Sequence, residues 1–261
     1  MKAKPIMLQG TASGVGKTIL TLALCRIFKQ DGYKVAPFKA QNMTSNTCLT
    51  PAGDEIAMSQ HLQALAAGIE PCLDMNPILL KPPFAGQKRP EERAELIMQA
   101  YERLSEQYEI IVIEGAGSPV ELNLNKNDVI NMGMAKKAAA PVLLVSDIDR
   151  GGVFASLYGT IALLGEAAQS YVKATIVNRF KGDVLRFSDG VTILEEITKI
   201  PVAGVIPFVP VNLPEEDSLY EGNNSLASDF EKEFDSIAKT VRSSLDMELI
   251  YQILDGGMSV L

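Results

Sequence analysis

A glycine-rich segment near the amino terminus constrains this chain more than any other feature. It runs from Gly10 to Thr18 as GTASGVGKT, directly after the apolar run 5–9 and at the start of a helical pattern over 16–31. Between a strand and a helix, this spacing is typical of a P-loop, whose backbone N–H groups surround phosphate oxygens. A strict Walker A pattern would have its first glycine at position 11, where Thr11 stands. The competing interpretation is a glycine-rich turn that binds no nucleotide.

The P-loop pattern assigns a role to each of its residues. Lys17 is expected to reach the β- and γ-phosphates and to act in catalysis, and Thr18 to offer its hydroxyl to magnesium. The predicted cofactors are therefore ATP and Mg²⁺. The other residues of the loop expected to contact the nucleotide are Thr11, Ser13, Gly14, Val15 and Gly16.

Short apolar runs alternate with longer amphipathic segments along the rest of the chain. This alternation predicts βαβ units, and the lack of polar positions within the runs predicts strands that are covered on both faces. We therefore expect an α/β fold with a doubly wound, mostly parallel sheet of the P-loop NTPase type. The predicted strands are 5–9, 33–38, 110–114, 141–146, 173–178 and 201–206, and the predicted helices are 16–31, 54–68, 91–108, 129–138, 153–168 and 185–199.

Three segments depart from this alternation. Residues 71–90 are rich in Pro and Gly and predict a mobile surface loop near the site, and residues 207–225 predict an irregular stretch. Apolar positions at helical spacing over 229–254 predict one amphipathic helix. The expected organisation is a synthetase domain over 1–225 followed by a helical tail over 226–261.

The composition of the chain limits the kinds of partner and environment that it can have. With 47% hydrophobic and 21% charged residues, the 261-residue chain can bury a core, and its net charge of −8 argues against nucleic-acid binding. The three cysteines and the lone His61 lack the spacing of a metal site. No apolar run reaches the length of a membrane span. These features predict a soluble, reduced, cytoplasmic protein, in which His61 is structural or exposed and not catalytic.

Two predicted strands end in acids. Glu114 closes one and Asp147 the other, so both are expected at the carboxyl edge of the sheet, where open α/β sheets bind ligands. We interpret Glu114 as a magnesium ligand, the alternative being a solvated acid at a strand end. Lys39, at the end of another strand, is placed to neutralise the γ-phosphate or a substrate carboxylate, unless it is a surface lysine.

These residues together resemble the synthetase domain of the cobyric acid synthase family, which is related to dethiobiotin synthetase. Two strings carry the most specific part of the resemblance, QNM at 41–43 and DIDRGG at 147–152. The other matching strings are KPIMLQGT at 4–11, DGYKVAPFK at 31–39, AGIEP at 67–71, DMNPILLKP at 74–82, VIEGAGSP at 112–119, NMGMA at 131–135, NRFKGD at 178–183 and EDS at 216–218.

The resemblance implies ATP-dependent amidation of peripheral carboxylates of a corrin ring, in cobalamin biosynthesis. The partners would be a corrinoid acid and ammonia, in a protein expected to form a homodimer. Among the implied roles, Glu55 completes the metal site with Glu114, and Gln41 and Asn42 face the phosphate and the substrate. Asp147 and Asp149 serve the reacting centre, and Asn178 holds the nucleotide base.

The family usually carries a glutaminase domain with a nucleophilic Cys and a His base. The residues after position 218 contain neither, so ammonia from a separate glutaminase is one expectation. Three alternatives stay open: a dethiobiotin-synthetase-like activation of another acid, a ParA/MinD-like nucleotide switch, and an inactive paralogue. A switch of that group usually needs a second lysine in the P-loop, and positions 11–15 contain none.

Overall fold

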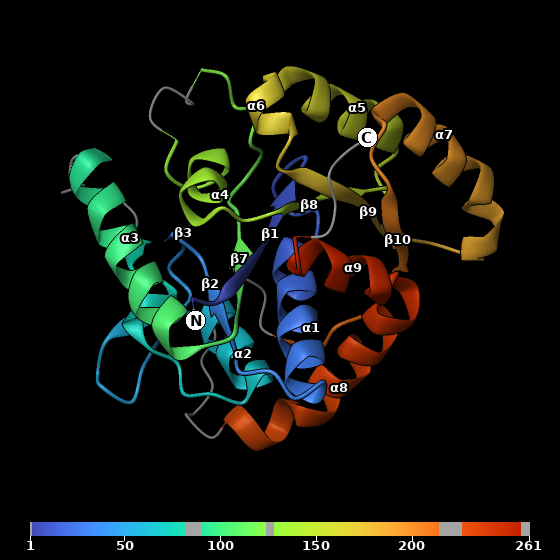
Figure 1. Cartoon of the computed structure of the whole chain (residues 1–261). Helices are drawn as coiled ribbons and strands as arrows, with labels where there is room; N and C mark the ends of the chain where they lie inside the picture. The colour runs from blue at the N-terminus through green and yellow to red at the C-terminus, as the bar shows by residue number, and fades with distance from the viewer. Residues whose placement is uncertain (1, 82–89, 124–127, 214–225, 257–261) are drawn as a thin grey trace. The chain divides into compact units, whose positions relative to one another are not determined.

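The computed structural model describes residues 2–81, 90–123, 128–213 and 226–256 (Figure 1). It divides into two compact units that alternate along the sequence. Unit 1 is Met1–Lys4, Thr18–Glu114 and Val211–Ala238, and unit 2 is Pro5–Lys17, Gly115–Pro210 and Lys239–Leu261. The chain therefore passes from one unit to the other inside the P-loop motif, between Lys17 and Thr18. The division into a domain over 1–225 and a tail over 226–261 stays a prediction.

In unit 2 the strands of the larger sheet have the order β10-β9-β8-β1. In unit 2, β1 (Lys4–Gly10) pairs with β8 (Val142–Asp147), β8 with β9 (Val172–Phe180), and β9 with β10 (Val202–Pro207), all in parallel. Every residue of β8 is buried, and its first four residues form the apolar run that a strand covered on both faces requires. The mostly parallel sheet with flanking helices confirms the predicted fold class.

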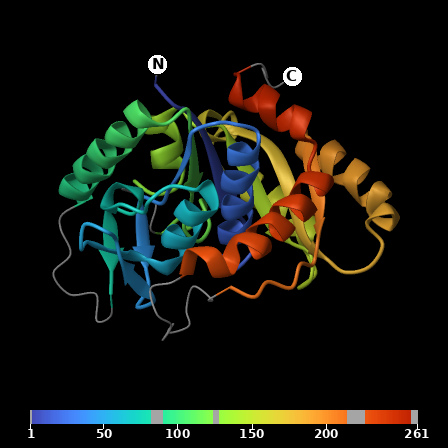
Figure 2. The ribbon, with the colours of Figure 1, turned by 90° about the horizontal axis from the view of Figure 1, so that it is seen from below.

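The helices of unit 2 follow its strands (Figures 1 and 2). Helix α5 packs on β8 and on α7, while α7 and α9 pack on β10. The bounds of the helices in this unit are α4 Met132–Ala138, α5 Val153–Leu163, α6 Glu166–Gln169, the 3-10 helix η3 Val184–Phe187, α7 Ser188–Thr198 and α9 Met247–Leu254.

Unit 1 contains the parallel pair β2 (Val35–Phe38) and β7 (Ile110–Glu114), and both strands are buried throughout. It also holds two small sheets, one of β3 (Gln41–Met43) with β6 (Ile78–Leu80) and one of β4 (Thr47–Leu49) with β5 (Glu55–Ala57). The helices that lie wholly or largely in this unit are α1 Lys17–Gln30, α2 Met58–Ala67, the 3-10 helix η1 Leu73–Met75, α3 Pro90–Gln107 and α8 Leu226–Ser244.

The predicted strands all form, with ends within two residues of those predicted, but the helix predictions need four corrections. The helix expected over 54–68 starts at Met58, because residues 55–57 pair with β4 in an antiparallel hairpin. The helix expected over 129–138 starts at Met132, because the carboxylate of Asp128 accepts hydrogen bonds from the N–H groups of Ile130, Asn131 and Gly133. The segments 153–168 and 185–199 each divide into two helices.

Two of the irregular or terminal predictions also change. The stretch 71–90 was expected to be a loop, yet η1 and β6 form within it, and β6 pairs with β3. Residues 82–89 of that stretch lie outside the described residues. The single helix expected over 229–254 is two helices, α8 and α9. They separate where Leu245 forms a bridge with Gly204 and the N–H of Asp246 donates to Ala203.

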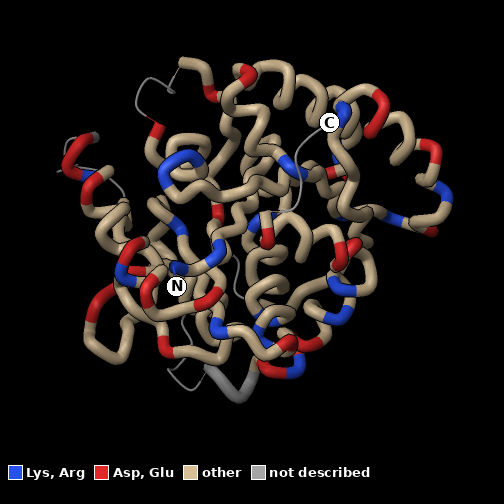
Figure 3. Tube along the Cα trace, viewed as in Figure 1, with Lys and Arg blue, Asp and Glu red and all other residues tan. Residues whose placement is uncertain are grey.

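Charged residues of both signs are interspersed along the described trace (Figure 3). Within the described residues, none of the helices has the combined length and apolarity that a membrane crossing requires.

Candidate nucleotide site

The P-loop of unit 2 follows β1 and closes around the side chain of Lys17. The ammonium of Lys17 donates to the carbonyl of Ala12 at 3.1 Å and to that of Gly117 at 3.2 Å, and the residue is 7% exposed. A Cβ on Gly10 would lie 2.8 Å from this ammonium and 2.9 Å from the Ala12 carbonyl. Glycine at position 10 is therefore what lets the loop close over the lysine.

Asn178 stabilises the same loop. Its side-chain amide donates to the carbonyl of Val15 at 2.8 Å, and a Cβ on Gly16 would lie 2.1 Å from that amide nitrogen. Gly16 also has a φ of +97°, which disfavours other residues. The structure thus gives Asn178 a place against the P-loop backbone, while its contact with a nucleotide base stays a prediction.

Asn131 holds the segment after β7 in place through its side-chain amide. Its side chain accepts from the N–H of Ala116 at 3.0 Å and donates to the carbonyls of Ala116 and Ser118 at 2.7 and 3.2 Å. This fixes the segment whose Gly117 carbonyl binds the Lys17 ammonium. Only the NMGMA string, noted through the resemblance, pointed to this residue.

Both predicted acids of the reacting centre lie in unit 2, and both are paired with basic residues. Asp147 is buried at the end of β8 and accepts from Arg179 at 3.0 Å, and from the N–H of Asp149 at 2.8 Å. The carboxylate of Asp149 pairs with Lys181 at 2.8 Å. The predicted residue Thr11 donates its hydroxyl to Ser146, next to Asp147, at 3.0 Å.

In unit 1 the carboxylate of Glu114 is the centre of a buried polar cluster. One oxygen, Oε1, accepts from the hydroxyl of Thr18 and from the ammonium of Lys39, both at 2.9 Å. The other, Oε2, accepts from the amide of Gln63 at 2.7 Å and lies 3.5 Å from that of Gln60. The structure thus brings together three of the predicted residues, and Gln63 joins them although no sequence pattern indicated it.

The predicted substrate residues Gln41 and Asn42 lie on β3, also in unit 1. Gln41 accepts from Arg93 at 3.0 Å, and Asn42 donates to Ser59 and Gln60 at 3.2 and 3.0 Å. Both residues are buried. Gln60 therefore connects Asn42 to the cluster around Glu114.

Glu55 was expected beside Glu114 as a metal ligand. It lies on β5, where its carboxylate pairs with Lys81 and accepts from the hydroxyl of Thr47. The hydrogen bonds from Lys81 and Thr47 lower the pKa of the Glu55 carboxyl. The hairpin that replaces the first turn of the expected helix explains this placement, and a metal contact of Glu55 stays a prediction.

The donors around Glu114 suit magnesium. Within the described residues, no group of three or more His, Cys, Asp and Glu could hold a metal ion. Magnesium does not require such a group, since it keeps several waters and usually takes one or two carboxylates together with phosphate oxygens. A hydroxyl and a carboxylate 2.9 Å apart, Thr18 and Glu114, are hard oxygen donors of this kind.

The three cysteines lie in environments that suppress the reactivity of their thiols, and the histidine is also affected by burial. Burial raises the pKa of the Cys25 thiol, and the negative charge of Glu114 adds to this effect. Burial, with a contribution from Glu55, raises the pKa of Cys48 to about 12. Burial also raises the pKa of Cys72 and lowers that of His61. The three thiols are therefore unsuited to thiolate chemistry at neutral pH.

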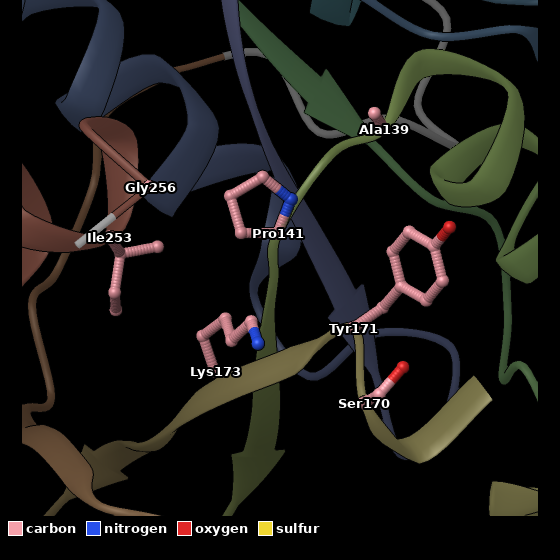
Figure 4. Close-up of a pocket in the computed structure, with 7 residues that line it drawn as sticks. All are labelled: Ala139, Pro141, Ser170, Tyr171, Lys173, Ile253 and Gly256. Atoms are coloured by element: carbon pink, nitrogen blue, oxygen red, sulfur yellow. The ribbon is translucent and has the colours of Figure 1, made fainter. Parts of the chain in front are cut away.

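Unit 2 also contains a hollow with a volume of about 320 Å³ (Figure 4). It lies where β8 and β9 begin, whereas the P-loop follows the carboxyl end of β1. In parallel strands these are opposite edges, so we do not include this hollow in the candidate site. Its lining residues are Ala139, Pro141, Ser170, Tyr171, Lys173, Ile253 and Gly256.

Comparison with known families identifies the domain that carries this loop. Residues 4–215 match a family described as an AAA domain. The chain belongs to this AAA-domain family. The match includes the P-loop and all the predicted site residues.

Among curated proteins, this AAA domain is similar to cobyric acid synthases, which confirms the expected resemblance. It is 51% identical to the protein from Lachnoclostridium phytofermentans over 242 residues, covering 84% of this chain and 47% of that one. It is 46% identical to the protein from Yersinia enterocolitica over 250 residues, covering 88% of this chain and 49% of that one. The chain thus spans about half the length of these relatives.

A solved structure supports the fold. The signal recognition particle receptor FtsY from Elizabethkingia anophelis, in complex with GDP, matches with a TM-score of 0.50 and 20% identity. The match covers 90% of this chain and 64% of that one. At this identity the likeness supports the shared fold alone.

Proposed function

We propose that this chain is an ATP- and magnesium-dependent ligase that amidates side-chain carboxylates of a corrin ring, in the manner of a cobyric acid synthase. The observation that carries the proposal is the identity of 46–51% to cobyric acid synthases over more than four fifths of this chain. The P-loop and the cluster around Glu114 supply the groups that such a reaction needs.

The proposed chemistry begins with activation of the carboxylate. A carboxylate reacts poorly with ammonia until one oxygen is converted into a leaving group, and transfer of the γ-phosphoryl group of ATP to that oxygen forms an acyl phosphate. Ammonia then attacks the carbonyl carbon, the C–N bond forms, and inorganic phosphate leaves. The main obstacle is the repulsion between two anions, which positive charges offset.

Each proposed role rests on a contact already described. Lys17, enclosed by backbone carbonyls, is proposed to exchange those acceptors for phosphate oxygens. Thr18 and Glu114 are proposed to hold magnesium, which when bound neutralises phosphate charge. Lys39, already paired with Glu114, is proposed to face the γ-phosphate and the substrate carboxylate. Asp147 and Asp149 are proposed to act at the reacting centre, and Gln41 and Asn42 to bind and orient the substrate.

A substrate panel tests this proposal directly. The purified chain is incubated with ATP, magnesium and ammonium chloride, and with cobyrinic acid a,c-diamide, a dethiobiotin precursor or no acid, and the products are analysed by mass spectrometry. We expect the mass of the corrinoid acid to change by one amidation for each modified carboxylate, with matching release of ADP. The dethiobiotin precursor and the reaction without acid should give neither. ATP turnover that depends on the dethiobiotin precursor would refute the corrinoid assignment.

A further inference from the structure

We propose that Arg150 is a phosphate-binding residue, whose guanidinium contacts the phosphate chain of a nucleotide held by the P-loop. The inference rests on the proposed nucleotide site and adds a residue to it. All the residues that carry the argument belong to unit 2.

The first observation is the position of the guanidinium. Arg150 follows β8, and a Cβ built on Gly14, in the middle of the P-loop, would lie 3.9 Å from its Nη2 atom. Gly14 has a φ of +71° and carries no side chain that could cover the loop. The cation therefore stands directly beside the backbone that is proposed to surround phosphate.

The second observation is that Arg150 is weakly held where it lies. Its Nε is 3.8 Å from the carboxylate of Asp147, too far for a hydrogen bond, and its side chain is 76% exposed. Asp147 is already satisfied by Arg179 at 3.0 Å and by the N–H of Asp149 at 2.8 Å. The guanidinium can thus turn to a phosphate without leaving a buried carboxylate unpaired.

The third observation is that the backbone of Arg150 is well anchored. The N–H of Gly151 donates to the carbonyl of Ile148 at 3.0 Å, which closes a tight turn around Arg150. Gly151 and Gly152 follow with φ values of +77° and +73°. A fixed backbone with an exposed side chain keeps the guanidinium near the loop and lets only its rotamer change.

These features favour phosphate over other ligands. A guanidinium presents a planar set of N–H donors that matches two phosphate oxygens at once and stays charged at all physiological pH values. Arg179, the other arginine at Asp147, is engaged in a hydrogen bond with that carboxylate. Arg150 is therefore the arginine of this pair that is available for a ligand.

The chain offers a matched control in the same unit. Arg186 is also exposed, at 86%, and its Nε lies 4.0 Å from the carboxylate of Asp183, three residues before it. Arg150 and Asp147 have the same spacing in the sequence. Arg186 lies on η3 and has no assigned role in the site. Replacing either arginine removes one charge and one loose ion pair. The two variants therefore differ in where the replaced side chain lies relative to Gly14.

The test measures the binding of ATP and AMP by calorimetry to the parent chain and to Arg150→Ala, Arg150→Lys and Arg186→Ala. One or two charge-assisted hydrogen bonds to phosphate are lost in Arg150→Ala, so its Kd for ATP should rise about tenfold to a hundredfold. Its Kd for AMP should change less, since fewer phosphate oxygens are present. Arg150→Lys should fall between the parent and Arg150→Ala, and Arg186→Ala should match the parent.

Parental ATP affinity in Arg150→Ala would overturn the inference, as would equal losses in Arg150→Ala and Arg186→Ala. Unfolding midpoints of all variants, measured in the same preparations, show whether a loss of affinity reflects misfolding; a lowered midpoint in Arg150→Ala that accounts for its loss counts against the inference. Failure of the proposed amidation is seen separately, as a parent chain that binds ATP but makes no amide. A parent without ATP affinity overturns both proposals before any variant is made.

Discussion

The ammonium of Lys39 and the carboxylate of Glu114 form a buried ion pair in unit 1, with 2.9 Å between Nζ and Oε1 and side-chain exposures of 5% and 1%. Two opposite charges that are buried this deeply stabilise each other. Removing one leaves the other unpaired in a medium that solvates it poorly. The hydroxyl of Thr18 and the amide of Gln63 complete the coordination of the carboxylate. The pair therefore matters for stability as well as for the proposed chemistry.

Removing one partner of this pair should destabilise the protein strongly. We expect Lys39→Met to lower the free energy of unfolding by about 3 kcal/mol, measured by urea denaturation without magnesium. Glu114→Gln should also destabilise, because it leaves the lysine unpaired. The double variant should lose less than the sum of the two single losses, by about 1–3 kcal/mol. Strictly additive losses would show that the two groups are not coupled.

Gln63 should act on magnesium through Glu114. Gln63→Met keeps the size of the side chain but removes the donor to Oε2, so the carboxylate loses one of the contacts that orient it. We expect the magnesium concentration for half-maximal ATP turnover to rise about tenfold, since ligand-orienting contacts are typically worth 10–100-fold in metal affinity. Turnover at saturating magnesium should fall much less.

The matched control for this variant is Gln99→Met. Gln99 is an exposed glutamine on α3 that donates to Glu95 at 3.1 Å. The same chemical change there should leave the magnesium requirement unchanged. If both variants shift the requirement equally, Gln63 has no special relation to the metal.

The P-loop lysine should matter for turnover far more than for stability. In Lys17→Ala the carbonyls of Ala12 and Gly117 lose a donor, so we expect a loss of about 1 kcal/mol of stability. ATP turnover should fall at least a hundredfold, because the missing charge would act on the phosphates in the transition state. Turnover is measured by phosphate release and stability by thermal unfolding. Turnover at the parental rate in this variant would refute the proposed nucleotide site.

The strands could be predicted because each buried strand is a run of apolar residues. Since Glu114 and Lys39 stand at or just after the ends of such runs, their neighbourhood at the carboxyl edge could be anticipated. The partners of Glu114 could not, because Gln63 reaches it through the packing of α2, and nothing in a helical pattern states which face meets which strand. The β4–β5 hairpin was missed because pairing between short strands overrode a local helical pattern.

Backbone conformation was equally hidden in the sequence. Arg179 has a φ of +62°, a left-handed value that is uncommon outside glycine, and it forms a hydrogen bond with Asp147 from that conformation. No residue pattern indicates such a turn. Asp147 binds Arg179 closely and holds Arg150 only loosely. This difference between the two arginines could therefore be seen only in the structure.

His61 should make the protein sensitive to mild acid. Burial lowers the pKa of its imidazole in the folded state, so the unfolded chain binds the proton more readily. Stability contributed by neutral His61 is present above the unfolded pKa of about 6.5 and is lost as the pH falls through the folded pKa. We expect the urea midpoint of the parent to drop more between pH 7.5 and pH 5.5 than that of His61→Gln. Equal drops would show that His61 does not contribute.

The final prediction concerns the source of nitrogen, and we expect this chain by itself to use ammonia and not glutamine. Hydrolysis of the glutamine amide by the usual glutaminase needs a thiolate activated by a histidine, and the 261 residues contain one histidine and three cysteines. Cys25 is fully buried, and the pKa of the half-buried Cys48 is about 12, so neither supplies a thiolate at neutral pH. Burial raises the pKa of Cys72 as well.

Amide formation should therefore saturate with ammonium chloride and rise with pH as free ammonia increases, and glutamine should work only when a separate glutaminase is added. The measurement compares amide product from ¹⁵N-labelled ammonium with that from amide-labelled glutamine. The triple variant Cys25→Ala, Cys48→Ala, Cys72→Ala serves as the control, and its ammonia-dependent activity reports whether it is folded. Label transfer from glutamine in the parent, lost in this variant while its ammonia-dependent activity persists, would reveal a thiol-dependent glutaminase in this chain and contradict the prediction.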